Sequence, residues 1–356
     1  MDKKLIFFLA LFFSINVFSQ NIPQVPELVT LDKIRLNINE DARNEIQIEV
    51  DALHANAKYF NAIIDKINIY FPVIEKILEE EEVPTDFKYL SLQESSLISD
   101  AVSSSNAVGF WQFKSTTAKT YGLNINNLVD ERRNVVSSTR AAAKYLKNSN
   151  FVFDNWIFSL LSYMTGLTGA KSILDEKFYG SKRMEINKNT HWYIKRFLAH
   201  KIAYQDAISK ESYNDNFTIY TNYEAKNIED LSESLSVNLN DLKSYNKWLK
   251  SSELPRDKVY SFLVPLKSKN LYSQIKSSVI SKVKSFISSS KNSLIDEKIK
   301  LIAEKKMIFL NGLPSIIVDS DDTMDKILKL YSISKKSFLA YNDINSNHKL
   351  QIGVPY

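Results

Sequence analysis

The sequence predicts an α+β protein of several domains, in which an all-α domain over residues 51–210 precedes two small strand–helix–helix–strand modules. Two observations support this fold class. Between residues 51 and 205, apolar residues recur every three or four positions and no sustained alternation appears, which is typical of helices with one buried face. Further along, Ile228 and Met324 begin two similar apolar patterns that keep a constant offset of 96 positions, which indicates an internal repeat.

Composition agrees with a folded, multidomain protein. A chain of 356 residues is long enough for two or three domains, and 44% hydrophobic residues allow a buried core. Lys and Arg exceed Asp and Glu by 46 to 41, an excess that suits an anionic polymer but is too mild to predict nucleic-acid binding. The chain has no cysteine, which excludes disulfides and a lipid anchor on cysteine. We expect a monomer without cofactor or metal.

The first 19 residues are typical of a secretory signal peptide. A basic start at Lys3 and Lys4 precedes the apolar run 5–13, which Ser14 interrupts. A membrane anchor would need about 20 apolar residues. The sequence therefore predicts secretion across the inner membrane, with a periplasmic or cell-wall location and no membrane span after cleavage.

Elements within the mature chain follow from local patterns. Residues 20–50 lack clear periodicity, and we expect an extended arm there. Apolar residues from Leu53 to Leu78 predict a helix that Pro72 kinks, and a second helix begins near Thr85 and ends near Glu94.

The C-terminal part divides into two copies and a linker. Residues 217–267 and 306–356 each contain the order strand, helix, helix, strand, and the Ser/Lys-rich stretch 268–305 is predicted to be a linker. The pairs Tyr245-Asn246 and Tyr341-Asn342 are expected to stabilise the fold of each copy.

Glu94 is the candidate catalytic residue, because Gly109-Phe110-Trp111-Gln112 follows it at short range. Cleavage of a glycosidic bond needs a proton for the leaving oxygen. A carboxylic acid in an apolar pocket keeps its proton near neutral pH, since desolvation penalises the charged form. Aromatic rings also suit stacking on sugar faces. A sugar-cleaving enzyme is therefore the first hypothesis.

A second carboxylate, which most glycosidases use, is not obvious. Asp86 lies eight residues before Glu94 on the same helix, about 12 Å away and too far for a retaining pair. Asp100 is a candidate partner, and Asp130 and Glu131 cannot be placed from the sequence. Carboxylates such as these three are more often surface residues or helix caps. The absence of a clear partner indicates an enzyme that needs one acid only.

Residues 84–205 resemble the lytic transglycosylases of the goose-lysozyme-like type, glycoside hydrolase family 23. Within that family, the resemblance is greatest to the membrane-bound lytic murein transglycosylase D group. The residues that carry it are Glu94-Ser95, Ala101, Ser103, Ala107, Gly109, Trp111, Gln112, Tyr121-Gly122-Leu123, Asp130 to Arg133, Ala141 to Leu146 and Tyr193. Both C-terminal copies resemble LysM modules, and the second keeps Asp322-Thr323 of the usual Gly-Asp-Thr.

The resemblance implies a lysozyme-like fold and peptidoglycan glycan strands as the partner. It implies cleavage of the β-1,4 bond between N-acetylmuramic acid and N-acetylglucosamine, with 1,6-anhydromuramyl ends as product and targeting by the LysM modules. Glu94 would act first as acid and then as base. The substrate-binding residues it implies, with the family's Asn replaced by Met at position 164, are Ser95, Ser103, Gly109, Trp111, Gln112, Tyr163, Met164 and Tyr193.

The sequence departs from the family pattern at two positions and leaves two alternative functions open. Asn106 stands where the family often has Gly, and Asn tolerates a left-handed backbone, so the turn should form. Met164 cannot form the hydrogen bonds of an Asn. The alternatives are a catalytically impaired peptidoglycan-binding protein of the same fold and a muramidase-type hydrolase that leaves reducing ends.

Overall fold

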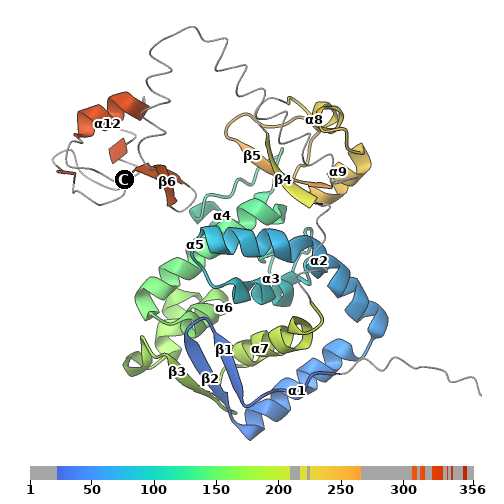
Figure 1. Ribbon diagram of the computed structural model, residues 1–356, viewed down its shortest axis with the longest axis vertical. Helices are drawn as coiled ribbons and strands as arrows, with labels where there is room; N and C mark the ends of the chain where they lie inside the picture. Colours follow the sequence, from blue (N-terminus) through green and yellow to red (C-terminus); the bar gives the residue numbers. More distant parts are fainter. Residues whose placement is uncertain are drawn as a thin grey trace, which may run out of the picture.

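The computed structural model describes residues 22–208, 217–222 and 225–265 and parts of 307–350 (Figure 1). The expected signal peptide over residues 1–19 and the expected linker over residues 268–305 lie outside the described residues. Within the described part of the chain, no helix combines the length and the apolarity that crossing a bilayer requires.

Seven α-helices form the larger domain among the described residues. Three of them begin at an asparagine, Asn56, Asn134 or Asn155, whose side chain accepts hydrogen bonds from backbone N–H groups of the first turn. Pro72 does not split its helix, because one continuous helix includes this proline. The helices are α1 (Glu40–His54), α2 (Ala57–Glu80), α3 (Lys88–Ser95), α4 (Ser115–Thr120), α5 (Val135–Phe153), α6 (Trp156–Ile173) and α7 (Trp192–Gln205).

The predictions of an extended arm over residues 20–50 and of an all-α domain were wrong. Strands β1 (Leu28–Leu31) and β2 (Ile34–Ile38) form an antiparallel hairpin, and β3 (Arg183–Ile186) pairs in parallel with β2. Buried and exposed side chains alternate along β2, and α1 follows directly and packs against α7. Residues 22–54 are therefore part of the helical domain's own framework.

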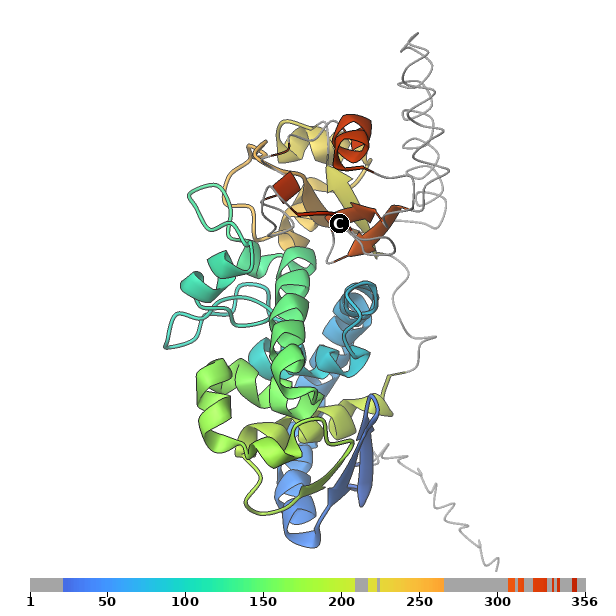
Figure 2. The same cartoon turned by 90° about the vertical axis from the view of Figure 1, so that its left-hand side faces the viewer.

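The core of this domain lies between the helices. Its largest fully buried side chains include Phe71, Phe87, Trp111, Phe153 and Phe197, which come from α2, α5, α7 and the loops near α3. Figure 2 shows α5 running through the domain, with the β1–β2–β3 sheet at one end. The chain contains no disulfide that could stabilise the fold. Burial of apolar side chains such as these rings is therefore the main source of stability.

The first C-terminal module has the predicted strand–helix–helix–strand order. Its elements are β4 (Phe217–Asn222), α8 (Ile228–Ser234), α9 (Leu239–Tyr245) and β5 (Tyr260–Pro265), with β4 and β5 antiparallel. Asn246 is buried, donates to the carbonyls of Leu242 and Leu263, and accepts from the Leu263 N–H. This asparagine ties the end of α9 to β5, which is the stabilising role expected for it.

The second copy is described only in part. Strands β6 (Met307–Leu310) and β7 (Leu313–Ile316) form a hairpin, and α12 (Met324–Tyr331) follows. This copy therefore begins with two strands where the sequence predicted one. The strand predicted to close the copy lies outside the described residues.

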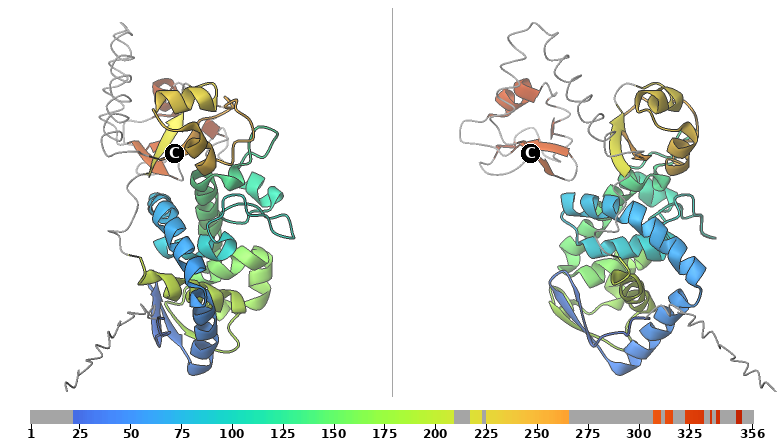
Figure 3. Two further views of the ribbon diagram at one scale, coloured as in Figure 1. Left: turned by 90° about the vertical axis from the view of Figure 1, so that its right-hand side faces the viewer. Right: turned by 45° about the vertical axis from the view of Figure 1, so that its right-hand side comes forward.

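The first module packs directly on the helical domain, at the end away from α1 and the sheet (Figure 3). Val129 of the helical domain lies in the module's hydrophobic core, and the Asp130 N–H donates to the Trp248 carbonyl at 2.8 Å. Glu131, only 1% exposed, accepts from the Asn124 N–H at 2.7 Å and from Lys258 Nζ of the module at 2.6 Å. A buried carboxylate with these partners fixes the module's orientation.

We expect Lys258→Met to lower the free energy of unfolding by about 1–2 kcal/mol, because Glu131 stays buried but loses its charged donor. Lys250→Met is the matched control. Its ammonium bonds only the Asn126 carbonyl at an exposed position, so a loss below about 0.5 kcal/mol is expected. Urea denaturation of both variants measures the difference. Equal losses would show that the buried pair does not join the two parts.

Candidate active site

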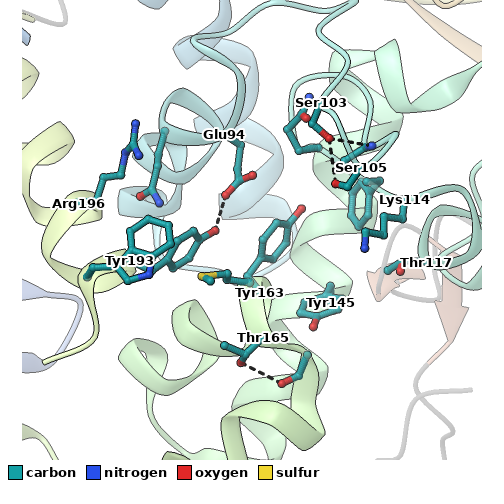
Figure 4. Close-up of a pocket in the computed structure, with 17 residues that line it drawn as sticks. Glu94, Ser103, Ser105, Lys114, Thr117, Tyr145, Tyr163, Thr165, Tyr193 and Arg196 are labelled. Carbon is teal, nitrogen blue, oxygen red and sulfur yellow. Dashed lines mark hydrogen bonds between the residues drawn. The ribbon is translucent and has the colours of Figure 1, made fainter.

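Glu94 lies in the last turn of α3 and faces a cleft of about 540 Å³, which we call the Glu94 cleft (Figure 4). The helix ends immediately afterwards, because Ser96 and Leu97 adopt left-handed φ angles of 51° and 56°. Burial raises the pKa of Glu94, while a hydrogen bond from Tyr193 and the charge of Arg196 lower it in part. The net effect is upward, so this carboxyl group keeps its proton more readily than an exposed glutamate.

Tyrosines surround the carboxyl group. The Tyr193 hydroxyl donates to Glu94 Oε1, and the Tyr163 hydroxyl donates to the Trp111 carbonyl at 2.8 Å. Tyr145 packs edge-on against Tyr163, with ring centroids 5.1 Å apart. Burial raises the pKa of both Tyr163 and Tyr193 well above the ordinary value, so both hydroxyls remain donors. Glu94 is therefore oriented by a fixed neutral donor.

A tight turn after Glu94 forms one wall of the cleft. Gly109 has φ +84°, and a Cβ atom there would lie 1.9 Å from the Arg132 carbonyl oxygen. Only glycine allows this approach of two backbone segments. Asn106 adopts φ 59°, which is the left-handed conformation expected for it. Arg132, paired with Asp130, donates to the Phe113 carbonyl at 3.3 Å and holds the far end of the turn.

The structure brings six of the nine predicted site residues into the cleft and leaves three outside it. Ser95 is buried and donates to the Phe110 carbonyl at 2.9 Å. Trp111 is fully buried, and its indole N–H donates to Thr139 of α5 at 2.9 Å, so its ring packs in the core. Gly109 provides backbone geometry alone. The six that line the cleft are Glu94, Ser103, Gln112, Tyr163, Met164 and Tyr193.

Among the described residues that line the cleft, Glu94 is the only carboxylate. The four acids considered as partners all bind cations elsewhere. Asp86 pairs with Lys201, Asp100 with Lys247, Asp130 with Arg132 and Glu131 with Lys258. The described part of the chain also contains no group of three or more residues suited to hold a metal ion.

The chain is similar to known proteins over part of its length. Residues 71–184 match the family profile described as "Transglycosylase SLT domain". The matched segment runs from the second half of α2 to the start of β3, and α1 and α7 lie outside it.

Over 174 residues the chain is 27% identical to "Membrane-bound lytic murein transglycosylase D" of Escherichia coli, from strain K12 and equally from strain CFT073. That alignment covers 47% of this chain and 38% of the relative, so the chain matches well under half the length of either relative. A solved structure of the lytic transglycosylase Slt from Pseudomonas aeruginosa matches with 16% identity and a TM-score of 0.30, over 47% of this chain and 31% of that one.

The Glu94 cleft also contains residues that sequence reasoning missed. Trp192 and Arg196 line it beside Tyr193, and Lys114 and Tyr145 line it elsewhere. One observation in the sequence could have identified Trp192 and Arg196. Residues at positions i and i+4 of a helix share a face, and Tyr193, a predicted site residue, is the neighbour of Trp192 in the chain. Trp192 is 49% exposed, an unusual position for a tryptophan unless it contacts a ligand or partner.

We expect Gly109→Ala to destabilise the helical domain by more than about 3 kcal/mol, because the new Cβ would collide with backbone. Gly122→Ala is the matched control. Gly122 has the same φ of +84°, but a Cβ there meets no atom within 4 Å, so only the conformational strain of about 1–2 kcal/mol applies. Thermal and urea unfolding of both variants give the comparison. If the two lose equal stability, the close approach at Arg132 is not a packing constraint.

Proposed function

We propose that this protein is a lytic transglycosylase that cleaves the β-1,4 bond between N-acetylmuramic acid and N-acetylglucosamine in peptidoglycan. The observation that carries the proposal is Glu94. It is a buried carboxyl group with a raised pKa, held by Tyr193, and is the only acid among the described residues lining the cleft. Its place in a domain homologous to the SLT domain supports the same reaction class.

Glu94 serves in two steps of the reaction. In the first, its proton passes to the glycosidic oxygen, the C1–O bond breaks, and positive charge develops at C1 of the muramyl ring. The acetamido group of the same ring shares that charge. In the second, the Glu94 carboxylate takes the proton of the muramyl 6-hydroxyl while that oxygen bonds to C1. The product is a 1,6-anhydromuramyl end, no water is consumed, and Glu94 regains its proton.

A hydrolase of the muramidase type is less well supported. Retaining glycosidases place two carboxyl groups about 5–5.5 Å apart and inverting ones about 6.5–9.5 Å apart. Asp86, Asp100, Asp130 and Glu131 each form an ion pair away from the cleft. With the substrate itself supplying the nucleophiles, a single carboxyl group is sufficient.

The two C-terminal modules concern the targeting of the protein to the cell wall. We propose that both modules are LysM modules that bind N-acetylglucosamine-containing glycan, with the first held in a fixed orientation by Glu131 and Lys258. The basic start and apolar run of residues 1–19 support secretion to the periplasm or cell wall. No cofactor takes part in the proposed reaction.

Met164 favours a second candidate function. It lies in the cleft with 45% of its surface exposed, at a position where the resembling family has asparagine. A thioether is only a weak acceptor and has no donor. The same fold would then bind peptidoglycan strands with little turnover.

One digestion separates these functions. Purified sacculi are incubated with the wild-type chain or with Glu94→Gln, and the released muropeptides are identified by mass spectrometry. We expect anhydro ends from the wild type and at least a 1,000-fold lower rate from the variant, since both proton transfers are lost.

Reducing ends that depend on Glu94 would instead establish the hydrolase. Binding without either product would establish the impaired protein, and Met164→Asn would then be expected to restore release of anhydro ends. Anhydro ends that persist in Glu94→Gln would contradict the assigned role of this residue.

The pH dependence of the rate tests the contact between Tyr193 and Glu94. The first step needs protonated Glu94, so the rate falls as pH rises through the pKa of that carboxyl group. Tyr193→Phe removes a hydrogen bond that lowers this pKa. We expect the alkaline limb of kcat/KM to move to higher pH, with kcat reduced about 10-fold because the carboxyl group is less well oriented.

Tyr145→Phe is the matched control for this measurement. Its hydroxyl donates to the Ser162 carbonyl and not to Glu94. We expect its alkaline limb to stay in place, whatever happens to its kcat. A shift of similar size in both variants would mean that the limb does not report the contact between Tyr193 and Glu94.

A further inference from the structure

Trp192 and Arg196 form a pair at one end of the Glu94 cleft. Trp192 is the first residue of α7 and Arg196 follows four positions later, so the two side chains share a helix face. Both line the cleft, and each is 49% exposed. In Figure 4, Arg196 and Lys114 lie at opposite sides of the cleft, with Glu94 between them.

The charges in the cleft are unbalanced. Among the described lining residues, Lys114 and Arg196 are cationic and Glu94 is the only acid. Burial raises the pKa of Glu94, which favours its neutral form. Two cationic side chains would contribute little to the binding of an uncharged glycan. Such an excess is complementary to an anionic ligand and accelerates its association.

Arg196 lies near an acidic residue of α1 but keeps its hydrogen-bond donors available on that side. Its Nε lies 4.0 Å from Glu49 Oε2, a distance at which charges attract but no hydrogen bond forms. Guanidinium has five N–H donors in a planar fork that matches a carboxylate. An aromatic ring four residues away adds an apolar platform with a polar edge.

We propose that Trp192 and Arg196 form a subsite for a hexosamine ring that carries a carboxylate, with the indole against the sugar face and the guanidinium on the carboxylate. This inference rests on the proposed function and deepens it, because it states which feature of peptidoglycan the cleft selects. In peptidoglycan that ring is the muramyl unit. Its carboxylate belongs either to the lactyl group itself or to the stem peptide attached there.

Binding measurements in a Glu94→Gln background test the subsite. This background stops turnover, and it also removes the effect of Arg196 on the ionisation of Glu94. Three tetrasaccharides are compared by calorimetry: neutral chitotetraose, a muramyl tetrasaccharide with free lactyl groups, and the same glycan with stem peptides. The background protein should prefer at least one muramyl ligand over chitotetraose.

Arg196→Gln in that background should weaken the preferred muramyl ligand about 10-fold and chitotetraose less than about 2-fold, since a half-exposed charged pair is lost only with the former. Whichever muramyl ligand loses more identifies the carboxylate as lactyl or as stem peptide. Trp192→Ala should weaken all three ligands by a similar factor, because the ring contacts the sugar face.

Two controls complete the design. Lys119→Gln removes one positive charge from the exposed surface of α4, outside the cleft, and should change the affinity for each ligand less than about 2-fold. Arg196→Lys keeps the charge and should retain part of the preference. Thermal melting confirms that each variant is folded.

The subsite is wrong if the background protein does not prefer a muramyl ligand. It is also wrong if Arg196→Gln weakens chitotetraose as much as the muramyl ligands. Failure of the proposed function would appear separately, as the absence of Glu94-dependent cleavage of sacculi by the wild-type chain.

Discussion

The close approach of Gly109 to the Arg132 carbonyl is the constraint on which the rest of the site depends. It presses the turn over residues 101–113 against the segment 130–133. Hydrogen bonds connect these two segments to α3 on one side and to the first module on the other. Toward α3, the Phe110 carbonyl accepts from Ser91 and Ser95 and fixes the helix that ends in Glu94. Toward the first module, Asp130 and Glu131 bond Trp248 and Lys258. Glu94 and the first module are therefore positioned by one piece of backbone.

Opposing effects set the pKa of Glu94, and their net result is a raised value. Burial favours the protonated form, which makes the carboxyl group a weaker acid and its carboxylate a stronger base. Tyr193 and Arg196 lower the pKa again, so that the carboxylate can form once the proton has left. In the proposed reaction one carboxyl group acts first as acid and then as base, and both proton transfers are most efficient when its pKa lies near the working pH. Both moderating residues come from the same face of α7.

Local patterns in the sequence predicted the elements whose partners are close by. Apolar spacing placed Glu94 near the end of a helix, and the offset of 96 residues predicted the fold of the first module. Long-range partners could not be predicted. Trp111 looked like a sugar platform because nothing nearby in the sequence indicates Thr139, 28 residues away, as the acceptor for its indole. The strands of four and five residues were too short for their alternation to stand out, and β3 pairs with β2 from 148 residues away.

The N-terminal residues 22–54, for which the sequence prediction was wrong, hold α7 in place. Lys195 pairs with Glu45 and Arg196 lies near Glu49, so two consecutive residues of α7 face two acids one turn apart on α1. The face of α7 that carries Tyr193 and Arg196 is thus held toward Glu94 by a helix that precedes the SLT-homologous region in the chain. The motifs within that region include Glu94 and the turn that follows it. The orientation of the opposite wall, and with it the proposed choice of sugar, depends on residues that lie outside those motifs.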